Sequence, residues 1–112
     1  MKPFVNERYD KSTNMYIRRF RVSTCFPCYL SFFYTAQREL ESISFDAAYA
    51  DDYHYEIKVD QIPKLLYAQS NAYSEIDIVT LFTKQLCACS NPIEISSWLR
   101  DIGVEFQIFH FD

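Results

Sequence analysis

Glycine is nearly absent from this chain, since Gly103 is the single glycine among its 112 residues. Glycine-rich phosphate-binding loops and the G-x-S-x-G turn of α/β-hydrolases each need at least two glycines, and an EF-hand loop needs acidic ligands around its glycine. None of these motifs is present. The sequence therefore excludes these common nucleotide-binding and hydrolase motifs, and we expect a protein without a cofactor and without enzymatic activity.

Length and composition favour a single domain with one core, because 49% of the residues are hydrophobic. No apolar run approaches the roughly 20 residues that cross a bilayer. The N-terminal segment MKPFVNERYD is charged and has no apolar stretch of the kind found in secretory signals. We therefore expect a cytoplasmic protein whose four cysteines are reduced thiols.

Alternation of apolar and polar residues predicts three strands. It is clearest from Tyr53 to Asp60, and it is also present from Met15 to Thr24. The segment from Val104 to Phe111 has apolar residues on both faces, which predicts a strand in the interior of the sheet. The intervening segment 45–52 is acidic and predicts a connection.

Apolar residues spaced three and four apart predict helices in the rest of the chain. Pro27 and Pro63 suit the first turns of two of them. Ser74 precedes a third, and the fourth lies between an Asn-Pro cap and Gly103, which predicts its end. The predicted helices cover residues 27–43, 63–69, 75–89 and 91–102.

These elements give the order β-α-β-α-α-α-β. We predict an α+β fold in which a small mixed sheet of at least three strands is packed by three to four helices on one side. Residues 15–112 form this single domain. Residues 1–14 show no clear period and predict an irregular N-terminal arm.

Carboxylates and tyrosines cluster around the start of the 53–60 strand. Tyrosine provides contact area at little cost in side-chain entropy, and carboxylates complement a basic groove. The alternative is an ordinary polar linker followed by a half-exposed strand. The predicted partner-binding residues are Asp46, Tyr49, Asp51, Asp52, Tyr53, His54, Glu56 and Asp60.

Charge is distributed unevenly along the chain. Residues 1–45 carry seven basic and four acidic side chains, whereas residues 46–112 carry four basic and eleven acidic ones. A small acidic protein without a catalytic motif matches the general profile of immunity proteins, antitoxins and phage anti-defence or anti-CRISPR proteins. We therefore expect an inhibitor that occludes a basic site on a protein target, such as a nuclease or a nucleic-acid-binding complex, and that binds neither membrane nor nucleic acid directly.

The cysteines support two alternatives. Cys25 and Cys28 lie between a predicted strand and a predicted helix, as in a thiol-disulfide oxidoreductase, although buried thiols are the simpler explanation. Together with Cys87 and Cys89 they could bind zinc, but the C-x-C spacing of the second pair is unusual for a structural zinc site.

Two further interpretations concern the basic and aromatic residues. Arg18, Arg19 and Arg21 stand among aromatic residues, as in a nucleic-acid-binding strip. Pairing of these arginines with nearby carboxylates on a solvated strand face is the simpler interpretation. Exposed aromatic residues would also suit a structural or oligomerisation module.

Overall fold

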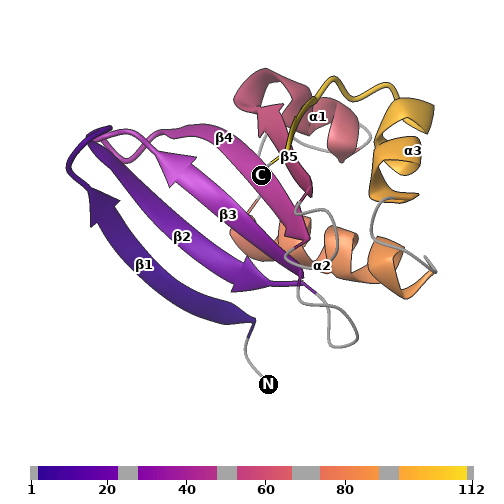
Figure 1. The fold of residues 1–112 in the computed structure, drawn as a ribbon, viewed down its shortest axis with the longest axis horizontal. Helices are drawn as coiled ribbons and strands as arrows, with labels where there is room; N and C mark the ends of the chain where they lie inside the picture. The colour runs from indigo at the N-terminus through magenta and orange to yellow at the C-terminus, as the bar shows by residue number, and fades with distance from the viewer. Residues whose placement is uncertain (1–2, 23–27, 48–52, 67–73, 89–93, 111–112) are drawn as a thin grey trace.

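Strands that follow one another in the sequence also lie next to one another in the sheet. The computed structural model describes residues 3–22, 28–47, 53–66, 74–88 and 94–110. Within these residues the sheet order is β1-β2-β3-β4-β5-β6, and every neighbouring pair is antiparallel (Figure 1). The strands are β1 (Phe4–Asp10), β2 (Met15–Arg21), β3 (Cys28–Tyr34), β4 (Leu40–Ala47), β5 (Tyr53–Lys58) and β6 (Gln107–His110).

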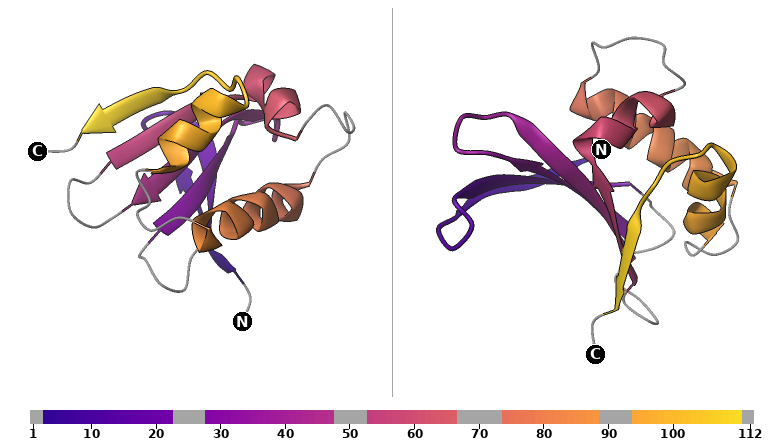
Figure 2. Two further views of the ribbon diagram at one scale, coloured as in Figure 1. Left: turned by 90° about the vertical axis from the view of Figure 1, so that its right-hand side faces the viewer. Right: turned by 90° about the horizontal axis from the view of Figure 1, so that it is seen from above.

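The helical elements fall between β5 and β6 and lie together on one side of the sheet, as both views in Figure 2 show. They are the 3-10 helix η1 (Val59–Gln61), α1 (Ile62–Leu65), α2 (Glu75–Cys87) and α3 (Glu94–Asp101). None of the helices in the described part of the chain is long and apolar enough to cross a membrane.

The core lies between the sheet and the helices. Phe82 of α2 is fully buried and stacks on Phe45 of β4, with ring centroids 5.8 Å apart. The same ring meets Trp98 of α3 edge-on at 5.3 Å. Tyr55 of β5 stacks on Phe45 from the neighbouring strand. These aromatic contacts join α2 to the sheet and α3 to α2.

Several predicted elements are confirmed. Strands β2 and β5 lie inside the predicted segments 15–24 and 53–60, and α2 covers most of 75–89. Ser74 caps α2, because its hydroxyl accepts from the backbone NH of Asp77 and the Asp77 carboxylate accepts from the backbone NH of Ser74. Gly103 has a φ of +79°, the left-handed conformation that suits a residue after a helix end. The α+β class is confirmed.

The predicted helix over 27–43 is wrong in the described residues, which form the hairpin of β3 and β4. Cys28, Leu30 and Phe32 alternate toward the core and are fully buried. The chain turns between the strands without glycine or proline, and Arg38 adopts a positive φ of 65° there. The apolar residues that suggested a helical period therefore belong to two strands and the turn between them.

Three smaller predictions are also wrong. The N-terminal segment is not irregular throughout, because β1 pairs with β2. Strand β6 is an edge strand, not an interior one, since in the described residues it pairs only with β5. The sheet is antiparallel rather than mixed, because every neighbouring pair of described strands runs in opposite directions. The observed order is β-β-β-β-β-α-α-α-β.

Candidate protein-binding surface

Strand alternation places part of the predicted acidic set on the face of the sheet that the helices leave open. Tyr55 and Ile57 of β5 are buried in the core under the helices. The intervening residues His54 and Glu56 must therefore lie on the opposite side of the sheet. Asp46 of β4 is the cross-strand partner of His54 and shares this side. We call this side the helix-free face.

The carboxylates of Asp46 and Glu56 each have a cationic neighbour. The Asp46 carboxylate lies 3.7 Å from the guanidinium Nη2 of Arg19. The Glu56 carboxylate lies 2.9 Å from the Lys58 ammonium, and this hydrogen bond raises the pKa of Lys58 above its ordinary value. The local charge is therefore more balanced than the sequence suggested.

The other predicted site residues do not all join this face. Strand β5 ends at Lys58, so Asp60 lies exposed in η1, where strand alternation no longer places its side chain. Tyr53 begins β5, and its side chain lies outside the described part of the structure. Tyr49, Asp51 and Asp52 also lie outside the described residues. The proposed continuous strip from Asp46 to Asp60 is thus described only at Asp46, His54 and Glu56.

Two residues that sequence reasoning did not assign to the site complete it. Tyr29 of β3 is the cross-strand partner of Asp46, and the guanidinium of Arg19 lies 4.1 Å from the centre of its ring. The guanidinium of Arg19 therefore contacts both the Tyr29 ring and the Asp46 carboxylate. The alternation of Ile17, Arg19 and Arg21 was visible in the sequence, but only a correct prediction of β3 would have placed Arg19 near Asp46.

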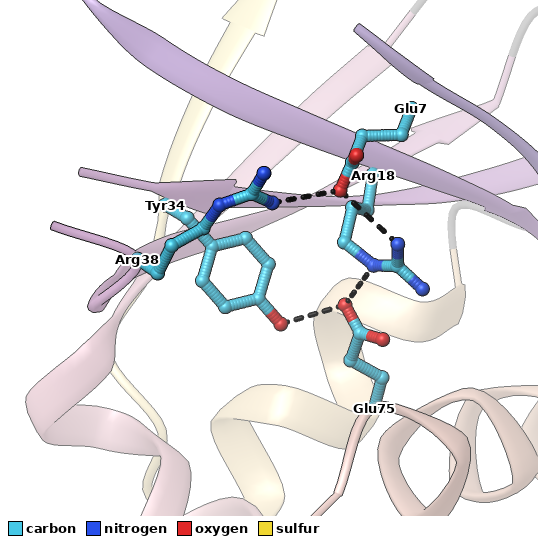
Figure 3. Close-up of polar contacts among 5 residues, drawn as sticks. All are labelled: Glu7, Arg18, Tyr34, Arg38 and Glu75. Carbon is cyan, nitrogen blue, oxygen red and sulfur yellow. Dashed lines mark hydrogen bonds and ion pairs between the residues drawn. The ribbon is translucent and has the colours of Figure 1, made fainter. Parts of the chain in front are cut away.

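A second polar cluster lies on the helix side and links the sheet to α2 (Figure 3). The Nε of Arg18 donates to Glu75 at 2.8 Å, and its Nη1 donates to Glu7 at 3.1 Å. The hydroxyl of Tyr34 donates to the same Glu75 oxygen at 2.6 Å. Arg38 donates to Glu7 at 3.1 Å. The cluster therefore connects β1, β2, β3 and the turn after β3 to the first turn of α2.

The electrostatics of this cluster are those of a structural ion-pair network. The hydrogen bond from Arg18 holds the pKa of Glu7 below its ordinary value, and the hydrogen bond to Glu75 raises the pKa of Arg18. Arg18 also packs over the rings of Phe4 and Phe20, at 4.8 and 5.8 Å from their centres. Arg18, like Arg19, therefore pairs with carboxylates, which supports the simpler interpretation of the arginine-rich strand.

The structure removes the local context on which the redox alternative depended. Cys28 is a buried residue of β3 and does not precede a helix. Burial and the neighbouring Asp46 raise the pKa of its thiol to about 12, which opposes thiolate formation. Cys25 and Cys89 lie outside the described residues. In the described part of the chain no group of three or more His, Cys, Asp or Glu side chains is arranged to hold a metal ion.

Comparisons with known protein families, with curated protein sequences and with solved structures find no match to this chain.

Proposed function

We propose that this chain is a non-catalytic protein that binds and inhibits a macromolecular target by covering a basic site on it. Immunity proteins, antitoxins and phage anti-defence proteins act in this general way. The observation that carries the proposal is the adjacency of Asp46 and His54 on the helix-free face, with Glu56 next along β5. A net charge of −4 adds a favourable long-range field for a basic target.

The helix-free face combines the two kinds of group that a protein interface uses. Tyr29 and Arg19 form a stacked pair beside Asp46, and tyrosine and arginine are enriched in interface hot spots. Asp46 and Glu56 supply carboxylates on neighbouring strands. The fixed spacing of these two carboxylates determines where a target must carry its arginine or lysine side chains. Because the paired strands β2, β3, β4 and β5 hold these groups, the surface is preorganised.

The internal ion pairs do not prevent such binding. The side chains of Asp46 and Glu56 are 28% and 25% exposed, and their partners Arg19 and Lys58 are 35% and 59% exposed. Ion pairs at solvent-accessible positions contribute little net stability, because water competes for both charges and salt screens them. An arginine or lysine of a target can therefore replace Arg19 or Lys58 at little cost in free energy.

The proposal is tested by affinity capture from extracts of the native cell, followed by mass spectrometry. The bait is the tagged wild-type chain, compared with a double variant that carries Asp46→Asn and Glu56→Gln. We expect one dominant protein with the wild type and its loss with the double variant. The same charge change at Glu39→Gln and Asp101→Asn is the matched control, because Glu39 lies before β4, at the far end from Asp46, and Asp101 ends α3.

Thermal melting of all variants separates loss of binding from loss of folding. If the folded Asp46 and Glu56 variant captures the same protein as the wild type, the helix-free face is not the binding surface. If the control variant alone loses the captured protein, the interface lies elsewhere on the molecule.

A further inference from the structure

Strand β1 is an edge of the sheet, and its side chains are unusually exposed. It pairs only with β2 in the described part of the chain, and six of its seven residues are exposed. Five large hydrophobic side chains are exposed among the described residues, and three of them belong to β1. These are Phe4 at 42%, Val5 at 46% and Tyr9 at 45% exposure. An exposed edge strand with apolar side chains is a template for pairing with another strand.

The strand also has two features that restrict such pairing. The register with β2 shifts between Phe4 and Asn6, so the regular part of β1 runs from Asn6 to Asp10. This part carries the charged residues Glu7, Arg8 and Asp10. Bulges and charges usually prevent uncontrolled edge-to-edge pairing. Any partner strand must therefore match both the short regular segment and its charges.

A second copy of the same strand can match these charges. A two-fold axis perpendicular to the sheet pairs β1 with its copy in antiparallel orientation and keeps directly opposite residues on the same face. An axis through Glu7 places two glutamates opposite each other, and an axis through Arg8 does the same with two arginines. An axis through Asn6 would carry the pairing into the irregular part of β1 at Phe4 and Val5, and an axis through Asp10 would place two aspartates opposite each other. Such like-charge pairs are destabilising. An axis through Tyr9 instead places Arg8 opposite Asp10 of the second copy, twice.

The local structure around Tyr9 suits this register. Its ring packs on Tyr16 of β2 with centroids 5.1 Å apart, and its hydroxyl donates to Asn14, so the ring is fixed at the sheet edge. Asp10 accepts hydrogen bonds from the backbone NH and the hydroxyl of Ser12. These bonds hold the pKa of Asp10 below its ordinary value, so its carboxylate is charged at neutral pH.

We propose that two copies of this chain associate through β1, about a two-fold axis at Tyr9, so that their sheets join into one continuous antiparallel sheet. Arg8 of each copy then faces Asp10 of the other, and the two Tyr9 rings meet at the axis. Strands β4 and β5 are separated from β1 by β2 and β3, so the helix-free face around Asp46 stays open in both copies. Because β1 ends at Asp10, this register pairs Arg8, Tyr9 and Asp10 of each copy and leaves Phe4 and Val5 outside the paired segment. An interface of this length is small, so the dimer forms only at high protein concentration.

Charge exchange between two variants tests the register directly. In the dimer, Arg8→Glu places a second carboxylate opposite Asp10, and Asp10→Lys places a second cation opposite Arg8. We expect each variant alone to sediment as a monomer at concentrations at which the wild type dimerises. An equimolar mixture of the two should dimerise again, because both cross-strand pairs are then of opposite charge. Lys84→Glu, an exposed change on α2, is the control that should leave the wild-type dimer intact.

Analytical ultracentrifugation over a concentration series is the measurement, with circular dichroism as the check on folding. Asp10→Lys removes the bonds to Ser12, whereas Arg8→Glu keeps both bonding partners, Asp10 and Ser12. Arg8→Glu alone therefore still tests the interface if the other variant unfolds. A wild type that stays monomeric at every concentration would overturn the proposal. A dimer that persists in folded Arg8→Glu, or a mixture of folded variants that stays monomeric, would do the same.

Discussion

Phe82→Ala should remove an aromatic contact that joins α2 to the sheet and to α3. Phe82 is fully buried and touches the rings of Phe45 and Trp98, which belong to β4 and α3. The substitution removes an aromatic ring from a closed core, and the surrounding backbone can collapse into the space only in part.

The cost follows from three contributions. Burying a phenylalanine side chain contributes about 1.5–3 kcal/mol. Each favourable aromatic pair adds roughly 0.5–1.5 kcal/mol. Together with the residual cavity, a loss of about 4 kcal/mol is expected, within the usual range for Phe→Ala in a core. For a domain of this size, that loss lowers the Tm by on the order of 15 °C.

Urea unfolding followed by circular dichroism measures this difference. Ile76→Ala on the same helix is the matched control, because Ile76 is half exposed and its loss should change the free energy of unfolding by less than about 0.5 kcal/mol. If Phe82→Ala costs less than about 1 kcal/mol, or no more than Ile76→Ala, the helices do not pack on the sheet through this ring.

Three further predictions concern polar and titratable groups. A double-mutant cycle with Arg18→Met and Glu75→Gln, measured by urea unfolding, should give a coupling free energy of about 1 kcal/mol, because Arg18 Nε lies 2.8 Å from Glu75 Oε2 but the pair is partly exposed. A coupling near zero would contradict the network in Figure 3. The folded state lowers the pKa of Glu7 from 4.5, so the charged Glu7 side chain stabilises the fold above that pH, and this contribution is lost as the pH falls through the lowered pKa. The difference in unfolding free energy between wild type and Glu7→Gln should therefore shrink on acidification, and a difference that grows would contradict the pairing of Glu7. Cys87 is exposed and should react with iodoacetamide in the native protein, whereas the buried Cys28 should react only after unfolding. If peptide mapping finds Cys28 of the native protein alkylated as fast as Cys87, the Cys28 thiol is not buried.

The sequence predicted strands and helices correctly where one face of the strand or helix is buried and the other is exposed to solvent. In β5 the burial of Tyr55 and Ile57 alternates with polar residues, and the strand is where the alternation placed it. Helices α2 and α3 were predicted for the corresponding reason, and both Ser74 and Gly103 mark boundaries through their backbone geometry. In these segments the local pattern and the tertiary burial agree.

The sequence was misleading where that agreement is absent. Strand β1 is exposed along nearly its whole length, so it has no hydrophobic period. In β3 the neighbouring residues Ser31 and Phe32 are both buried, so alternation is obscured. The turn before β4 uses Arg38 at a positive φ, where glycine or asparagine would have been recognisable.

The candidate site was predictable only in part for the same reason. Asp46, His54 and Glu56 were selected from their local cluster, and the structure brings these three together on β4 and β5. The contribution of Arg19 and Tyr29 depends on the pairing of β2, β3 and β4. Because β3 was predicted as a helix, the sequence could not reveal that an arginine already lies beside Asp46.

The association rate with the captured target is the most direct test of the proposed function. Wild type and the double variant Asp46→Lys, Glu56→Lys should be compared by surface plasmon resonance over a range of salt concentrations, after melting shows that both fold. If the helix-free face covers a basic site, the variant should associate at least about tenfold more slowly, and added salt should slow the wild type far more than the variant. Equal association rates with equal salt dependence would contradict an electrostatic binding surface at Asp46 and Glu56.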